Sequence, residues 1–156
     1  MLAALALSVS LGACQAPVDH ALAAAGAQIS GPINASGSRG RTNCAIDGDA
    51  ADYGPGHGYA WAYLHTPTVI SFAGPVEINA VEIVLSDVYM QTYGYRVSVS
   101  TDGEKWVAVA DQTATPISGW RLHTFEPTVV SHLRLDFTST SVGAGSYHIV
   151  EVGAYR

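Results

Sequence analysis

Positive charge is scarce in this chain of 156 residues, and Lys105 is its only lysine. The 7 Lys and Arg residues are outnumbered by 13 Asp and Glu residues, which gives a formal net charge of -6 at pH 7. A protein that binds nucleic acid needs a basic face to neutralise phosphates. The composition therefore predicts that nucleic acid is not a partner, and it favours cations and neutral ligands.

Cysteine is scarce as well, since the chain has only Cys14 and Cys44, and no spacing of cysteine and histidine suggests zinc. Motifs of common catalytic sites are missing: the sequence has no G-x-S-x-G, no H-E-x-x-H and no Gly-rich loop before a helix. We therefore predict that the chain is not an enzyme.

One apolar run opens the chain, because residues 2–13 carry no charge and are mostly Ala and Leu. The run is too short to span a bilayer as a helix, but it is typical of an export signal. It ends in "LGAC", which resembles a bacterial lipoprotein signal, where a lipidated cysteine becomes the mature N-terminus. We therefore predict a lipoprotein signal peptide at 1–13 and a lipidated Cys14 that is the only membrane contact. The protein would be a cell-envelope lipoprotein, at the outer membrane in a Gram-negative cell, or secreted.

The alternative is a plain secretory signal, in which case Cys14 is available for a disulfide with Cys44 in an oxidising compartment. If Cys14 carries lipid, Cys44 is expected to be a small buried hydrophobic residue. Residues 14–27 lack an amphipathic pattern and are expected to form a tether.

Strand signals dominate from residue 28 onward. In the segment 95–110, valines alternate with serines, Asp102-Gly103 is typical of a hairpin turn, and an apolar strand returns. In the segment 132–139, Leu133, Leu135 and Phe137 share one face. Similar short strands are expected at 68–72, 76–86, 120–127 and 147–155. With no convincing helix, the sequence predicts an all-β domain over 28–156, built as an antiparallel two-sheet sandwich.

The order of five motifs resembles the discoidin family, also called the coagulation factor 5/8 C-terminal type domain. The motifs are "AIDGD" with Trp61 after it, "PVEINAVEIVL", "VSVSTDGEKWVAV", "HLRLDFTS" and "IVEVGAY". This resemblance covers about residues 40–156 and implies a galactose-binding-like jelly-roll sandwich similar to bacterial carbohydrate-binding modules. Trp61, Trp106 and Trp120 are expected mainly in the core, because each lies beside a strand.

The stretch "AIDGDAADYGPGHGYAW" crowds Asp47, Asp49 and Asp52 into six positions. The spacing does not fit an EF-hand, since Gly58 stands where the bidentate Glu belongs. Carbohydrate-binding members of the resembled family use this turn for a structural calcium, completed by a glutamate of the last strand, here Glu151. Calcium suits carboxylate and carbonyl oxygens. We therefore predict a structural Ca²⁺ at these four residues; an acidic turn in water is the alternative.

The resemblance also implies a sugar site in the end loops, where an aromatic ring stacks on the sugar and polar groups bind its hydroxyls. The candidate ligand-binding residues are His57, Tyr59, Asp87, Tyr89, Tyr93, Tyr147 and His148. The predicted function is a non-catalytic carbohydrate-binding module on a secreted or lipid-anchored bacterial protein, with a glycan as partner. The alternative is a protein-interaction or adhesin subunit of an envelope assembly, which would use the same fold against a cell-surface protein.

Overall fold

The computed structural model describes residues 16–36, 42–51, 58–88, 90–141, 143 and 145–156. The 3-10 helices are η1 (Ala23–Ala25) and η2 (Thr42–Ile46), and the strands are β1 (Gln28–Ser30), β2 (Asn34–Ser36), β3 (Tyr59–Tyr63), β4 (Thr68–Leu85), β5 (Tyr93–Ser100), β6 (Val107–Asp111), β7 (Gly119–Thr140) and β8 (Ser146–Tyr155).

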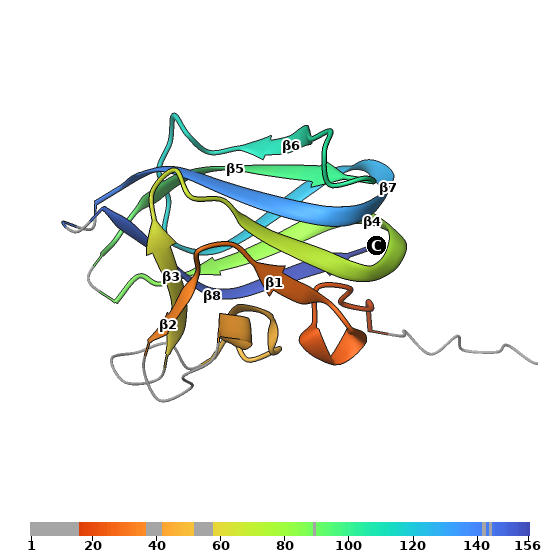
Figure 1. The fold of residues 1–156 in the computed structure, drawn as a ribbon. Coiled ribbons are helices and arrows are strands. Elements are labelled where there is room, and N and C mark those ends of the chain that lie inside the picture. The colour runs from red at the N-terminus through yellow and green to blue at the C-terminus, as the bar shows by residue number, and fades with distance from the viewer. Residues whose placement is uncertain (1–15, 37–41, 52–57, 89, 142, 144) are drawn as a thin grey trace, which may run out of the picture.

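Two long strands, β4 and β7, give the fold its two layers. The first part of β4 pairs with β1 and with the second part of β7, and this layer continues through β5 to β6. The second part of β4 pairs with the first part of β7 and with β8, and this layer continues through β3 to β2. Both long strands fold back at the same end of the molecule (Figure 1). One antiparallel sheet therefore doubles over, and the predicted two-layer sandwich is confirmed.

The long strands differ from the sequence prediction of many short ones. The predicted segments 68–72 and 76–86 are parts of the single strand β4, and 120–127 and 132–139 are parts of β7. A proline lies at each bend. Pro75 lies where the β4–β7 ladder is first interrupted, and Pro127 lies within the second interruption, between the pairs Ile78–Thr128 and Ala80–Thr124. Proline cannot donate a ladder hydrogen bond, which accounts for the gaps in pairing. Because pairing resumes beyond each gap, these positions are bends within a strand and not strand ends.

The core lies between the layers, and the alternating pattern predicted it well. Leu133, Leu135 and Phe137 are fully buried. The prediction for the tryptophans was wrong for Trp120, whose side chain is 49% exposed. It belongs to the first part of β7, at the edge of its layer, where β4 pairs along one side. Trp106 is half-buried beneath the guanidinium of Arg134, whose Cζ lies 4.7 Å from the ring centroid.

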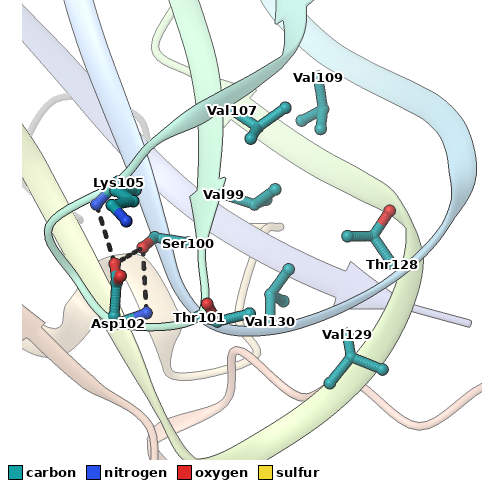
Figure 2. A pocket seen from close by; sticks show the side chains of 10 residues that line it. All are labelled: Val99, Ser100, Thr101, Asp102, Lys105, Val107, Val109, Thr128, Val129 and Val130. Carbon is teal, nitrogen blue, oxygen red and sulfur yellow. Dashed lines mark hydrogen bonds between the residues drawn. The ribbon is translucent and has the colours of Figure 1, made fainter.

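The connection between β5 and β6 is organised by Asp102. Its Oδ1 accepts hydrogen bonds from the N–H groups of Glu104 (2.9 Å) and Lys105 (2.8 Å) and from the Ser100 hydroxyl (3.0 Å). Gly103 has φ 76°, the left-handed conformation that an Asp-Gly turn predicts. This connection forms one side of a hollow of about 220 Å³, and the apolar part of its lining is made of valines of β5, β6 and β7 (Figure 2).

Asp102→Ala is expected to lower the melting temperature by a few degrees, because three donors lose their acceptor. The N–H of Lys105, followed by that of Glu104 and the Ser100 hydroxyl, holds the pKa of Asp102 below its usual value. A depressed pKa in the folded state gives stability that is present at neutral pH and lost as the pH falls through that pKa. The melting temperatures of wild type and variant should therefore differ at neutral pH and converge at acidic pH. Glu104→Ala is the control; an unchanged neutral melt of Asp102→Ala would contradict the assignment.

Residues 19–27 were expected to belong to a tether, but they pack on the domain. The Oδ1 of Asp19 accepts hydrogen bonds from the N–H groups of Ala21 and Ala154, both at 2.9 Å. The N–H of His20 donates to the carbonyl of Ala154 (2.8 Å), and Ala21 is fully buried. This stretch is thus part of the domain, attached to β8.

Cys44 is buried in the core, as predicted for the case in which it has no disulfide role. Cys14 lies outside the described residues, so its lipidation and the alternative disulfide stay predictions. Within the described ranges, no helix has the length and apolar character needed to cross a membrane.

Candidate functional site

The β4–β5 and β7–β8 connections lie side by side at one end of the sandwich, opposite the bends of β4 and β7 (Figure 1, left). Two hydrogen bonds join them. The N–H of Ser141 donates to the carbonyl of Thr92 (3.0 Å), and the N–H of Thr92 donates to Ser141 Oγ (2.9 Å). Two of the predicted ligand loops therefore meet, as expected for a sandwich with function at one end.

Tyr59, Gln91, Tyr93 and His148 form one connected cluster at this end. The rings of Tyr59 and His148 are stacked, with centroids 4.3 Å apart and an interplanar angle of 24°. The Oε1 of Gln91 lies 3.3 Å from His148 Nδ1 and accepts a hydrogen bond from the Tyr93 hydroxyl (2.7 Å). Ser146 Oγ lies 3.2 Å from His148 Nε2. Polar partners at both ring nitrogens fix the orientation of the imidazole.

Burial lowers the pKa of His148 below its ordinary value. The ring is therefore neutral near pH 7, with one nitrogen as donor and the other as acceptor. Tyr59 and Gln91 are half-buried, and His148 is 9% exposed. The parts of the cluster that a ligand can reach are thus an aromatic ring, an amide and the edge of an imidazole.

Two tyrosines of the predicted ligand set lie beneath this surface. Tyr93 and Tyr147 are fully buried, so their side chains support the site instead of contacting a ligand. The Tyr147 hydroxyl lies 2.7 Å from Thr68 Oγ1 and donates to the carbonyl of Thr66 (2.8 Å). Burial first, then Tyr59 and the carboxylate of Asp87, raise the pKa of Tyr93 far above its usual value, so it remains a donor.

Asp87 is exposed at the rim, at the end of β4, as a ligand residue should be. His57 and Tyr89 lie outside the described residues. Gln91 was not in the predicted ligand set, although it connects His148 to Tyr93. An amide in a loop gives no periodic signal, and only the tertiary contacts single it out.

Among the predicted metal residues, Glu151 lies on the outer side of β8, where η2 packs, and Asp47 and Asp49 follow η2. Glu151 is 6% exposed, and its Oε2 accepts a hydrogen bond from the N–H of Gly48 (3.2 Å). Gly48 has φ 85°, which glycine adopts without strain. The Oε1 of Glu151 is buried and accepts no hydrogen bond from the described residues. Burial raises the pKa of Glu151 to about 8; the Gly48 N–H opposes this, and the carboxylates of Asp47 and Asp19 add to it.

Glu151 lies on the outer side of β8 because the alternation of inward and outward side chains shifts by one residue within this strand. Tyr147 and Ile149 belong to the core cluster, and so do Val152 and Ala154, so the inward positions change from odd to even numbers between them. The register with β4 shifts at the same place, which is the signature of a β-bulge. Glu151 therefore turns outward, under the η2 turn.

Asp47 and Asp49 are exposed. The Oδ1 of Asp47 accepts a hydrogen bond from the N–H of Asp49 (3.1 Å). The Oδ1 of Asp49 accepts one from the N–H of Ala51 (3.1 Å). Asp52 lies outside the described residues. In the part of the chain that the structure describes, no three His, Cys, Asp or Glu side chains form a ready metal cluster. Any ion at this position would need main-chain oxygens of the turn as well, which is usual for calcium.

Comparisons with known proteins agree with this architecture. The model of the F5/8 type C domain matches residues 30–152. BTB/POZ domain-containing protein 9 of Rattus norvegicus is 33% identical over 99 residues, which are 63% of this chain and 16% of that protein's length.

Two solved structures share the fold at low sequence identity. The module CpGH89CBM32-5 from Clostridium perfringens, in complex with GalNAc-β-1,3-galactose, has a TM-score of 0.69 and 16% identity, covering 89% of this chain and 100% of that one. The CBM32 of AlyQ, in complex with 4,5-unsaturated mannuronic acid, has a TM-score of 0.67 and 13% identity, covering 89% of this chain and 98% of that one.

Proposed function

Because the chain belongs to the F5/8 type C domain family, we propose that it is a non-catalytic carbohydrate-binding module of an exported bacterial protein. The observation that carries this proposal is the cluster at the loop end, where Tyr59 stacks on a neutral His148 held by Gln91. Sugar sites combine a ring that covers C–H groups with a few fixed hydrogen-bonding groups. The complexes of the two similar modules, each with a sugar ligand, support the same class of partner.

Each accessible group has a distinct use in this proposal. The Tyr59 ring supplies apolar contact to the sugar face. The Oε1 of Gln91 is engaged by Tyr93 and His148, which leaves the amide NH₂ to donate to a sugar oxygen. The exposed Asp87 carboxylate accepts hydroxyl donors at the rim.

Tyr59→Ala is expected to weaken glycan binding by about tenfold or more, equivalent to about 1.4 kcal/mol or above. Gln91→Ala should have a similar effect, because it removes a donor and loosens His148. A glycan array with and without calcium identifies the ligand, and calorimetry then measures the affinity. Tyr63→Ala is the matched control, since Tyr63 lies on the same strand, is 57% exposed and is outside the cluster. Full binding by Tyr59→Ala would exclude this site.

The proposal includes a structural Ca²⁺ held by Asp47 and Glu151, with Asp49 and Asp52 as further candidate ligands. The buried Glu151 Oε1, to which no described residue donates, fits a cation ligand, and the adjacent Asp47 carboxylate adds a second hard oxygen. A bound calcium would supply the positive charge that allows Glu151 to be ionised where it is buried. It would also connect the η2 turn to β8.

The proposal further places the module at the cell envelope through a lipidated Cys14, as "LGAC" predicts. Mass spectrometry of the mature N-terminus tests this. A free thiol at Cys14, or cleavage elsewhere, would exclude it.

A protein partner is the second candidate function, favoured by the exposed apolar side chains near the loop end. Tyr63 is 57% exposed and Met90 is 89% exposed. An array with no glycan ligand, followed by a protein interaction that Met90→Ala weakens, would favour this alternative.

A further inference from the structure

A groove lies near the bends of β4 and β7. It is at the opposite end of the sandwich from the cluster of Tyr59, Gln91, Tyr93 and His148, which is called the loop cluster below. Its volume is about 450 Å³, and its lining includes Asn79, Glu82, Leu122, Tyr155 and Arg156. It lies on the outer face of the layer, because the alternate residues of β4, Val81 and Ile83, point into the core.

Two carboxylates compete for one proton at this groove. The Oη of Tyr155 lies 3.3 Å from Asp19 Oδ2 and 3.3 Å from Glu82 Oε2. A phenol carries a single hydrogen, so it serves one carboxylate at a time. Asp19 has two further donors, the N–H groups of Ala21 and Ala154. Among the described residues, only the shared phenol donates to Glu82, so Glu82 is the acceptor that a ligand can satisfy.

A glycine makes room for the Tyr155 ring in this position. Gly153 lies two residues earlier on the same face of β8, and any Cβ there would collide with the ring tip of Tyr155. Glycine at this position therefore leaves the room in which the ring lies back along the strand. Leu122, whose side chain is 60% exposed, lines the same groove and adds apolar surface.

We propose that this groove is a second carbohydrate site, selective for a sugar that carries a free amine. Its ammonium would bind Glu82 beside Tyr155, where a cationic donor offsets the two neighbouring carboxylates better than a hydroxyl does. Leu122 and the Tyr155 ring cover the apolar face of the sugar. Asn79 then meets its hydroxyls, and so does the free side of the Arg156 guanidinium, whose charge is offset by an ion pair with Glu77. The groove shares no residue with the loop cluster, so the two proposed binding sites can be tested independently of each other.

The test is an NMR titration of the full mature chain with a chito-oligosaccharide that has free amines, at mildly acidic pH. Amide shifts are expected at Ala80, Leu122 and Tyr155, and the N-acetylated oligosaccharide of the same length should produce no comparable shifts there. Glu82→Gln is expected to weaken binding about tenfold, as for loss of a charged hydrogen bond. The matched control is Glu126→Gln, which removes the same charge from an exposed position outside the groove.

Leu122→Ser is a second variant, chosen because an exposed side chain can be replaced without unfolding the domain. It should weaken amine binding severalfold, whereas Tyr59→Ala should leave it unchanged. If Glu82→Gln and Glu126→Gln weaken binding equally, the oligosaccharide is attracted only by the net negative charge of the chain. That result would overturn the proposal. Equal shifts with the N-acetylated ligand, or no shifts in the groove, would also overturn it.

Discussion

Glu151→Gln is expected to remove most of the calcium-dependent stabilisation of the domain, and to make the calcium-free domain more stable than wild type at about pH 8. Burial raises the pKa of Glu151 to about 8 from its ordinary value of 4.5. A raised pKa in the folded state gives stability that is fully present below the unfolded pKa, about 4.5, and is lost as the pH rises through about 8. In a chelator, the melting temperature of wild type should therefore fall across this range.

The size of the effect follows from the same shift. One pKa unit corresponds to about 1.4 kcal/mol, so a change from 4.5 to about 8 sets an upper bound of several kcal/mol. Glutamine keeps the shape and the acceptor for the Gly48 N–H, and it carries no charge at any pH. The pH dependence attributable to this position should therefore disappear in Glu151→Gln.

Calcium should act in the opposite direction on wild type, because it binds the ionised carboxylate. Binding to the native state alone stabilises by about 2.7 kcal/mol at a hundredfold excess over Kd. Thermal unfolding of wild type, Glu151→Gln and Asp47→Asn in calcium and in EDTA, from about pH 5 to about pH 8.5, measures both effects. Identical wild-type melts in the two buffers at the upper pH would reject the metal. A flat pH profile in EDTA would reject Glu151 as the buried acid.

The strand pattern was predictable because burial alternates with a period of two. Leu133, Leu135 and Phe137 were placed correctly on this basis alone. The joining of short strands into β4 and β7 was not predictable, since a proline at a bend and a proline at a strand end look the same in sequence. The distinction depends on whether a partner strand continues past it, and that is a tertiary property.

The proximity of the η2 turn and Glu151 came from the family resemblance and not from any local pattern. Gly48 and Glu151 are 103 positions apart, and the hydrogen bond between them depends on the bulge in β8. The packing of Asp19 on Ala154, 135 positions away, carried no signal, because its partners there include a backbone N–H group that every residue has. The metal ion itself remains a prediction.

The ligand set was harder to predict, because residues at a strand end belong to both loop and core. Tyr93 opens β5, and Tyr147 is the second residue of β8. A change of one position in register turns a side chain from one face to the other. Both therefore looked like loop aromatics in the sequence, and both lie in the core.

Phe137→Ala is expected to destabilise the domain by about 3–5 kcal/mol, the usual cost of removing a buried phenylalanine. Its ring stacks on Tyr147, with centroids 4.0 Å apart and an interplanar angle of 11°, and it contacts Tyr95 (5.4 Å) and Tyr93 (6.2 Å). All three tyrosines are fully buried, so the cavity left by alanine adjoins each of them. Chemical denaturation measures the loss, and Phe137→Leu, which keeps most of the volume, should cost markedly less.

The same substitution should weaken glycan binding in molecules that remain folded, although Phe137 lies beneath the ligand surface. Tyr93 holds Gln91 through its hydroxyl, and Gln91 lies against His148, which stacks on Tyr59. Loosening Tyr93 therefore disorders the groups proposed to contact the sugar. Calorimetry at low temperature, where the variant is still folded, should show affinity falling in the order wild type, Phe137→Leu, Phe137→Ala. Undiminished affinity in a strongly destabilised Phe137→Ala would mean that the loop cluster holds its geometry without the aromatic core beneath it.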